Sequence, residues 1–520
     1  MAEVLAEAPA GTGGPAPAGI EPRAALAYPA IAADGLLRAA ARRWPDRTAI
    51  RFSDGGAAVT FADLDAGVER AAAALHRLIG TGGVCGVATA LDPAFGKAFY
   101  AVCRSGNAVV SLNPLHPTAA VVRALRTAGA RAAIVTAEMR ERLAPELPGL
   151  PLLELSTLDE AAPEERPAAQ PDALACVHFT SGTTGAPKGV RLSHRNLVVN
   201  AMQTADAHGL DEHSVVLNHL PAYHLMHLNA GVHAGATQVL CRADDPAEAI
   251  VDAGRCGATH YYSLPMRLAR LAAHPRLPEL ATGALRGLFS GGSALAPGAG
   301  AALRAHFGIP VIQGFGLAET TSMTHLDRPD RPKPGSAGPP AADTGCRIVD
   351  VDSRAPLPAG RAGEIEVRGP QLMLGYLDGS PALTADGWLP TGDVGYLDAD
   401  GYLFLVDRLK DVFKCDNEMV APSDLERELA AQPGVAGCAV VDRPDPIHGA
   451  VPHALVVLAD NDGARLDAIV RATNERLTPY QRIRYATAVA AIPRSPIGKI
   501  DRRALRARVA ETGEEPTWSL

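Results

Sequence analysis

A run of hydroxyl-bearing residues, glycines and one lysine lies between His178 and Asn196, with the sequence HFTSGTTGAPKGVRLSHRN. Glycine lets backbone N–H groups approach an anion closely, hydroxyls add hydrogen-bond donors, and lysine supplies a compact positive charge. A polyphosphate is therefore the natural ligand of this run. The spacing is not that of the common P-loop, because Pro187 precedes Lys188 and Gly189 follows it.

The residues on either side predict the elements that position the run. Residues 173–179 (ALACVHF) are apolar and predict a buried strand. Ser193 is suited to cap a helix, since apolar residues return at helical spacing in the sequence HRNLVVNAMQTADAH that follows it. We therefore expect a loop that leaves the strand and ends at this helix.

Composition narrows the class of protein. The chain has 520 residues, of which 47% are apolar and 20% charged, and a formal net charge of −8. These values are typical of a globular protein and argue against a nucleic-acid partner, which a basic face would attract. No apolar run reaches the roughly 18 residues of a membrane span, and the start of the chain lacks the pattern of a signal peptide. The eight cysteines form no C-x-x-C pair that would indicate zinc or a disulfide framework. We expect a cytoplasmic protein without a membrane partner.

The order of predicted elements indicates two domains. Short apolar runs alternate with helical stretches up to about residue 400, which is typical of an α/β protein with several sheets. Beyond Asp407 the pattern changes and predicts helices at 423–431 and 464–477 and strands at 435–441, 453–458 and 485–491. We therefore predict a disordered tail (1–27), a large N-terminal multi-sheet α/β domain (28–407) and a small, mobile α+β C-terminal domain (408–520).

Four further segments carry chemistry of a similar kind: GFGLAET (314–320), TGD (391–393), DRLKDVFKCDN (407–417) and PRSPIGK (493–499). With the first run, in this order, they resemble the adenylate-forming superfamily of acyl-CoA synthetases, peptide-synthetase adenylation domains and luciferases, over roughly residues 35 to 510. The resemblance implies an ATP-dependent ligase with two steps. An acid attacks the α-phosphate of Mg-ATP and releases pyrophosphate, and an acceptor nucleophile then displaces AMP.

The resemblance also assigns catalytic roles. Glu319 would bind Mg²⁺, which prefers one or two carboxylates together with phosphate oxygens. Lys499 would reach the acid and the α-phosphate during adenylation, and Lys414 lies in the loop that would replace it after the small domain rotates about a hinge near Lys410. The pyrophosphate end of ATP would be held by Thr180, Ser181, Gly182, Thr183, Thr184 and Lys188.

The nucleoside contacts follow from the same resemblance. A carboxylate such as that of Asp393 can accept hydrogen bonds from both ribose hydroxyls. Ala318 stands where many relatives have a threonine that touches the α-phosphate, and either Thr320 or Thr321 is the candidate replacement. The residues implied around adenine and ribose are Gly291, Gly292, Gln313, Phe315 and Asp393, and Arg408 would contact the ribose or a phosphate.

Two departures from the family pattern bear on the substrates. Relatives that use coenzyme A commonly have glycine near the positions of Asp416 and Asn417, so the use of coenzyme A is left open and an amine acceptor is an alternative. His224 matches a histidine frequent in the family, whereas His227 falls where relatives tend to have glycine or alanine, which favours a small or polar acid. A metal site at this pair is disfavoured, because no third ligand stands in an obvious place.

Three functions remain open at this point. The first is a ligase that passes an activated acid to a thiol or an amine. The second is a relative in secondary metabolism that activates nitrite and diazotises an aromatic amine. The third is a non-catalytic nucleotide-binding relative, against which the presence of Lys188, Glu319, Asp393, Arg408 and Lys499 argues.

Overall fold

The structure is a computed structural model of the chain. It describes residues 26–56, 58–88, 92–114, 116–158, 162, 168–180, 188–219, 224–416, 418–459, 465–494, 500–511 and 518–519. Of the predicted tail, only the last two residues are described, and there the backbone N–H of Leu26 donates a hydrogen bond to the Asp343 carboxylate.

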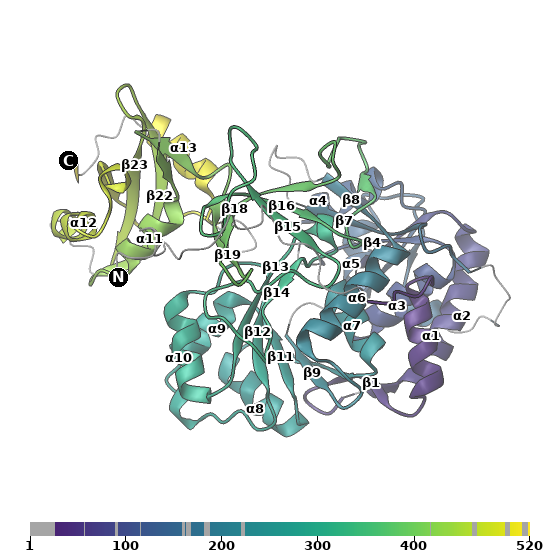
Figure 1. Ribbon diagram of the computed structural model, residues 1–520. Helices are drawn as coiled ribbons and strands as arrows, with labels where there is room; N and C mark the ends of the chain where they lie inside the picture. The colour runs from purple at the N-terminus through teal and green to yellow at the C-terminus, as the bar shows by residue number, and fades with distance from the viewer. Residues whose placement is uncertain are drawn as a thin grey trace.

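Two large sheets form the body of the larger part of the molecule (Figure 1). The first has the order β14-β13-β12-β11-β9-β10-β1-β2, with β1 Thr48–Phe52, β2 Ala58–Thr60, β9 Val215–Asn218, β10 Thr237–Leu240, β11 His260–Ser263, β12 Gly287–Ser290, β13 Val311–Phe315 and β14 His325–Leu326. The second has the order β17-β8-β7-β4-β3-β5-β6, with β3 Val84–Ala88, β4 Ala108–Ser111, β5 Ala132–Val135, β6 Leu152–Leu153, β7 Leu174–Thr180, β8 Lys188–Ser193 and β17 Gly375–Tyr376. Their central strands are parallel and are buried on both faces, which explains their continuous apolar sequences.

Helices cover both faces of each sheet. One core joins both sheets to the helices α1 Asp34–Arg43, α2 Phe61–Ile79, α3 Pro93–Arg104, α6 His194–His208 and α7 Leu225–Ala234. The outer face of the first sheet packs on α8 Pro246–Cys256, α9 Pro265–Ala272 and α10 Pro297–Phe307. The outer face of the second packs on α4 Thr118–Thr127 and α5 Ala137–Leu143. Short 3₁₀ turns occupy Leu155–Leu158, Leu277–Glu279, Ala318–Thr320 and Pro479–Gln481.

A third sheet leads from the larger part to the smaller C-terminal part. It is antiparallel and consists of β15 Gly345–Val349, β16 Gly363–Arg368, β18 Leu389–Leu397 and β19 Leu403–Arg408. The C-terminal part has its own sheet, made of β20 Phe413–Cys415, β21 Glu418–Val420, β22 Val435–Asp445, β23 Gly449–Leu458, β24 Tyr485–Ala488 and β25 Trp518–Ser519. Around it lie α11 Pro422–Ala430, α12 Leu466–Asn474 and α13 Arg502–Glu511.

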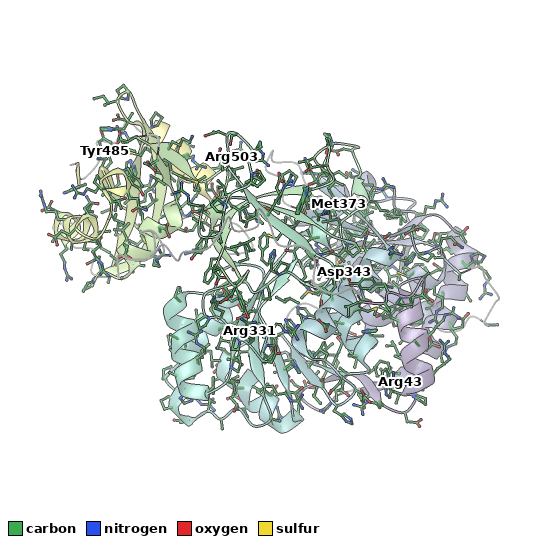
Figure 2. All side chains as sticks on the ribbon, viewed as in Figure 1. Arg43, Arg331, Asp343, Met373, Tyr485 and Arg503 are labelled. Atoms are coloured by element: carbon green, nitrogen blue, oxygen red, sulfur yellow. The ribbon has the colours of Figure 1, made fainter. Side chains whose placement is uncertain are left out.

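The C-terminal part has a hydrophobic core of its own, which contains Leu425, Val440, Val456 and Trp518. It projects from the end of β19 at the upper left of Figure 1. In Figure 2, Tyr485 and Arg503 lie in this part, whereas Asp343 and Met373 lie in the larger one. The predicted fold class, a large multi-sheet α/β domain followed by a small C-terminal domain, is confirmed.

The element that follows the phosphate-type run differs from the expectation. The predicted strand is present as β7, and Ser193 caps α6 in a capping box with Asn196, whose backbone N–H donates to the Ser193 hydroxyl at 3.0 Å. However, the loop does not end at the helix, because the antiparallel strand β8 intervenes and pairs with β7. Gly189, Val190 and Leu192 are buried while Lys188 and Arg191 are half-buried, and the segment is a strand because it pairs residue by residue with β7.

Candidate active site

Glu319, Tyr376 and Lys188 meet at one place although they come from three distant segments. The hydroxyl of Tyr376 donates a hydrogen bond of 2.9 Å to Oε1 of Glu319. The ammonium group of Lys188 lies 4.6 Å from the centre of the Tyr376 ring, which is a cation–π contact. Burial and the neighbouring Glu319 charge raise the pKa of Tyr376 above its usual value. Tyr376 therefore holds a cation against its ring and a carboxylate at its hydroxyl group.

Strand pairing explains why Glu319, Tyr376 and Lys188 lie close together. β17 pairs antiparallel with β8, so that Tyr376 faces Val190, two residues beyond Lys188. Glu319 belongs to the 3₁₀ turn after β13, and its carbonyl accepts a hydrogen bond from the backbone N–H of Met373, just before β17. Sequence reasoning missed Tyr376, because a two-residue strand has no periodicity and its position is set by its partner strand.

The turn that carries Glu319 is tightly packed. A Cβ atom at Gly316 would lie 2.3 Å from the carbonyl oxygen of Ser322, so only glycine fits there. The buried Thr320 hydroxyl accepts from the backbone N–H of Leu317 and donates to its carbonyl oxygen. The Thr321 hydroxyl donates to Gln371 O at 2.8 Å. A phosphate contact by either threonine would have to replace one of these bonds.

Asp393 is held in place by the loop that contains it. Its backbone N–H donates to the Thr391 hydroxyl, which in turn donates to Ile365 O. The N–H of Gly392, a residue with φ of +69°, donates to the Glu364 carboxylate at 3.0 Å. The register of β18 on β19 places Asp393 opposite Arg408, and the Arg408 Nε lies 2.7 Å from Oδ1 of Asp393. Asp393, expected to bind the ribose, and Arg408, expected to contact the ribose or a phosphate, are thus neighbours.

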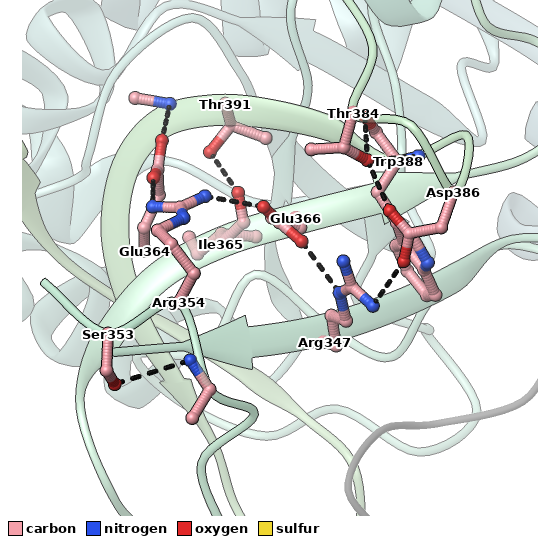
Figure 3. Close-up of polar contacts among 12 residues, drawn as sticks. Arg347, Ser353, Arg354, Glu364, Ile365, Glu366, Thr384, Asp386, Trp388 and Thr391 are labelled. Carbon is pink, nitrogen blue, oxygen red and sulfur yellow. Dashed lines mark hydrogen bonds and ion pairs between the residues drawn. The ribbon is translucent and has the colours of Figure 1, made fainter. Parts of the chain in front are cut away.

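An ion-pair network lies next to the loop that contains Asp393 (Figure 3). The carboxylate of Glu364, which binds the Gly392 N–H, also pairs with Arg354. Arg354 also pairs with Glu366, and Glu366 pairs with Arg347 at 2.7 Å. Both glutamates are buried, so the arginines compensate charges that water cannot reach.

The predicted adenine contacts lie at the ends of neighbouring strands. β12 pairs with β13 so that Ser290 faces Gln313, which brings Gly291 and Gly292 beside Gln313. The Gln313 side chain accepts a hydrogen bond of 2.9 Å from the backbone N–H of Leu295. Gly292 has φ of +91°, and a Cβ atom at either glycine would meet no atom within 4 Å. There is consequently open space beside both glycines, and Phe315 follows at the end of β13.

His224 and His227 lie at the start of α7, against the carboxyl ends of the parallel strands. Their ring centres are 4.8 Å apart, and the His227 ring lies 4.2 Å from that of Tyr262 on β11. Burial lowers the pKa of His224 to about 4 and lowers that of His227 further below its usual value. Both histidines are therefore neutral at pH 7. Ligands of open α/β sheets bind at this edge.

The loop expected to serve the second step lies in the C-terminal part. Lys414 forms an ion pair with Asp352, in the turn after β15 of the larger part, which raises the pKa of Lys414. Asp416 has φ of +52°, the left-handed conformation that glycine adopts more easily. Its carboxylate lies 2.6 Å from Nδ1 of His448, and its backbone N–H donates to His448 O.

Several predicted residues fall outside the described part of the chain. These are Ser181, Gly182, Thr183, Thr184 and Lys499, together with Asn417. Their described neighbours are placed, since Thr180 pairs with Lys188 across β7 and β8, and Arg494 pairs with Ile500 in an isolated bridge.

The donor set around Glu319 fits Mg²⁺ better than a transition metal. Within the described residues, no group of three or more His, Cys, Asp or Glu side chains could hold a metal ion. A single carboxylate that leaves most ligand positions to phosphate oxygens and water is the arrangement that Mg²⁺ accepts. Glu319 is the residue that would hold it.

No helix in the described part of the chain is long and apolar enough to cross a membrane.

Two family models match the sequence: "AMP-binding enzyme" over residues 37–377 and "AMP-binding enzyme C-terminal domain" over residues 424–499.

Individual relatives agree with these models. The chain is 32% identical over 492 residues to 4-coumarate–CoA ligase 3 of Oryza sativa subsp. japonica, covering 88% of each protein. The anthranilate CoA ligase AuaEII, solved in complex with anthranoyl-AMP, has a TM-score of 0.82 at 25% identity, covering 92% of this chain and 97% of that one. An amide bond synthetase of Marinactinospora thermotolerans has a TM-score of 0.81 at 27% identity, covering 92% and 99%.

Proposed function

Since this chain belongs to the AMP-binding enzyme family, we propose that it activates a small or polar carboxylic acid with ATP and transfers the acyl group to an acceptor. The acid oxygen attacks the α-phosphate, pyrophosphate leaves, and an acyl adenylate forms. The acceptor is the thiol of coenzyme A or an amine, and AMP is released with its attack. The enzyme acts in the cytoplasm.

The observation that carries this proposal is the joint placement of Lys188, Tyr376 and Glu319, with Asp393 and Arg408 paired on the neighbouring sheet. Phosphoryl transfer depends mainly on positioning and on neutralising charge. Lys188 binds the pyrophosphate end of ATP, and Glu319 holds Mg²⁺, which neutralises phosphate charge when bound. Asp393 binds the ribose.

The two steps need two arrangements of the small domain. Lys499 acts in adenylation, and the loop that contains Lys414 replaces it after rotation about a hinge near Lys410. Lys410 lies in the turn between β19 and β20, where its carbonyl oxygen accepts a hydrogen bond from Arg506. We also propose that the large domain spans residues 28–407 and the small domain residues 408–520, with a tail at residues 1–27.

Isotope exchange between pyrophosphate and ATP tests the first step, because it requires reversible adenylate formation and no acceptor. We expect exchange with at least one acid from a panel of aliphatic and aromatic carboxylates, and its loss in Glu319→Gln. Absence of exchange with every acid, at ATP concentrations at which nucleotide binding is measured directly, would favour a non-catalytic nucleotide-binding protein instead.

A second candidate function is ATP-dependent activation of nitrite and diazotisation of an aromatic amine. It is supported by the resemblance, because His227 at the start of α7 and Asp416 in the acceptor loop stand where relatives that use coenzyme A tend to have smaller residues. Pyrophosphate release with nitrite that depends on an aryl amine would establish it. Release with a carboxylate and coenzyme A would exclude it as the main activity.

A further inference from the structure

The turn between β22 and β23 carries a histidine that is paired with a carboxylate. His448 lies in this turn, and its Nδ1 is 2.6 Å from Oδ1 of Asp416, in the loop expected to serve the second step. β20 pairs with β23 at Cys415 and Gly449, which places the two residues side by side. The backbone N–H of Asp416 also donates to His448 O at 3.2 Å. The pair is therefore held by backbone contacts as well as by its side chains.

The second ring nitrogen of His448 has no hydrogen-bond partner among the described residues. A carboxylate only accepts hydrogen bonds, so Nδ1 of His448 carries a proton and Nε2 is the free acceptor of the neutral ring. The His448 side chain is 27% exposed, so a ligand can reach this nitrogen.

A second exposed histidine–carboxylate pair lacks this property. Nε2 of His274 lies 3.3 Å from Asp245, and Nδ1 of His274 accepts the backbone N–H of Arg276. Both nitrogens of that ring are occupied. The ring of His448 can therefore take up a proton from a ligand without losing a contact, whereas the ring of His274 cannot.

The surroundings of His448 also favour a ligand. Asp416 has φ of +52°, and a non-glycine residue in this left-handed conformation costs about 1 kcal/mol or more, which is commonest at functional sites. Ile447, beside His448, is 84% exposed, the highest value among the exposed large apolar side chains of the described residues. Burying such a side chain contributes about 1.5–3 kcal/mol. A ligand with an apolar body would gain this contact.

A histidine with one free nitrogen and a carboxylate at the other is suited to remove a proton. The carboxylate holds the required tautomer and stabilises the imidazolium that forms. An amine that attacks an acyl adenylate needs such a base, because its nitrogen becomes positively charged and must lose a proton. A thiol needs it less, because a thiol ionises near neutral pH on its own.

We infer that the acceptor of the second step is a primary amine with an apolar body, and that His448 is the base that takes its proton. The amine nitrogen forms a bond to the acyl carbon, the bond from that carbon to the phosphate oxygen breaks, and AMP leaves with the electron pair. The proton moves from the nitrogen to Nε2 of His448 and then to water, while Asp416 holds the ring. The inference rests on the proposed function, because the proposed rotation brings this loop to the adenylate.

Single-turnover transfer from synthetic adenylates tests the inference without requiring the first step. The donors are acetyl-AMP and benzoyl-AMP, and the acceptors are butylamine and aniline. We expect the full-length protein to form an amide from at least one of these combinations faster than the reaction without protein. His448→Ala should slow amide formation by about 100-fold or more, as expected for loss of a positioned base. Added imidazole should restore part of the rate.

Further variants assign the effect to the free nitrogen. His448→Gln keeps a donor that can reach Asp416 but cannot take up the proton, so it should be as slow as His448→Ala. Asp416→Asn keeps an acceptor for Nδ1 but loses the charge, and should slow amide formation less than His448→Ala does. His274→Ala is the matched control, because the His274 side chain is 21% exposed and also lies beside a carboxylate. It should leave the rate unchanged.

The outcomes separate this inference from the proposed function. Amide formation from none of the combinations, equal rates in His448→Ala and His274→Ala, or a loss that imidazole does not restore would overturn the role of His448. Amide formation that depends on His448, without pyrophosphate exchange for any acid, would overturn the proposed activation by ATP and leave the inference standing.

Discussion

The hydroxyl of Tyr376 lies 2.9 Å from Oε1 of Glu319, a residue 57 positions earlier in the chain. The same ring carries Lys188 on its face. The two-residue strand β17 thus aligns the residue proposed for Mg²⁺ with the residue proposed for pyrophosphate. Because a hydrogen bond to a charged group contributes about 1.5–3 kcal/mol, this contact should affect the activity measurably.

Tyr376→Phe should lower kcat/KM for ATP by about 10- to 100-fold, since Glu319 loses the donor that orients it. The measurement is pyrophosphate–ATP exchange at varied Mg-ATP. Tyr402→Phe is the control, because the Tyr402 hydroxyl donates to Arg331 O at a similar distance of 2.9 Å. A Tyr376 variant as active as this control would show that Glu319 does not depend on Tyr376.

Arg354→Met should destabilise the loop that holds Asp393. The variant leaves the buried Glu364 and Glu366 without one of their arginine contacts. Because the Arg354 side chain is 40% exposed, we expect a loss near the lower end for such pairs, about 1–3 kcal/mol of unfolding free energy. Urea denaturation measures it, with the exposed pair of Arg471 and Asp467 as a control through Arg471→Met. Equal losses in the two variants would contradict the structural role of the network.

Stability should fall as the pH is lowered from about 6.5 to 4. Burial lowers the pKa of several histidines to about 3 or 4, so over this range the unfolded chain binds protons that the folded chain does not. The unfolding free energy is therefore complete above pH 6.5 and decreases below it. The histidines concerned are His194, His208, His219, His224, His325 and His453.

Three carboxyls work in the opposite direction. Burial raises the pKa of Asp327 to about 7 and also raises the pKa values of Asp424 and Glu426, so their contributions to stability grow as the pH falls. The six histidines outnumber them. Urea midpoints between pH 7.5 and 5 check the sign, and a midpoint that rises on acidification would refute it. His453→Asn should make the dependence shallower.

Asp416→Gly with Asn417→Gly should increase transfer to coenzyme A without changing the adenylation step. Glycine accepts the positive φ of residue 416 without strain and removes the side chain that contacts His448. Single-turnover transfer from preformed adenylate to coenzyme A measures the effect. His448→Ala is the control, since it removes the contact but leaves the backbone as it is. Unchanged transfer in the double variant would mean that Asp416 and Asn417 do not limit the acceptor.

The local parts of the fold could be predicted from the sequence. The strand β7 depends on a run of apolar residues, and the cap of α6 depends on the side chain of Ser193. Both were predicted. The strand β8 was taken for loop, because Lys188, Gly189 and Arg191 interrupt its short apolar alternation. The two helices and three strands predicted for the C-terminal part lie near α11, β22, β23, α12 and β24, whereas β20, β21, α13 and β25 were not predicted.

The contacts between the residues of the site depend on tertiary structure, and most of them could not be predicted from the sequence. The motif residues Glu319, Asp393 and Arg408 were named from the resemblance, but their partners Tyr376 and Glu364 were not. Tyr376 is placed beside Lys188 and Glu319 because β17 pairs with β8. Glu364 is placed beside the loop of Asp393 by the register of β16 on β18. The roles of Lys499 and of residues 181–184 stay predictions.

The ion pair between Lys414 and Asp352 joins the small C-terminal part to the larger one, and its two side chains are 45% and 69% exposed. Exposed charges attract each other less at high ionic strength, where the Debye length falls from about 10 Å at 0.1 M to about 3 Å at 1 M. The hydrophobic cores of the two parts do not weaken in this way. Salt should therefore weaken the contact between the two parts while both stay folded. If the small domain rotates as proposed, ionic strength becomes a means of shifting the balance between the two proposed steps.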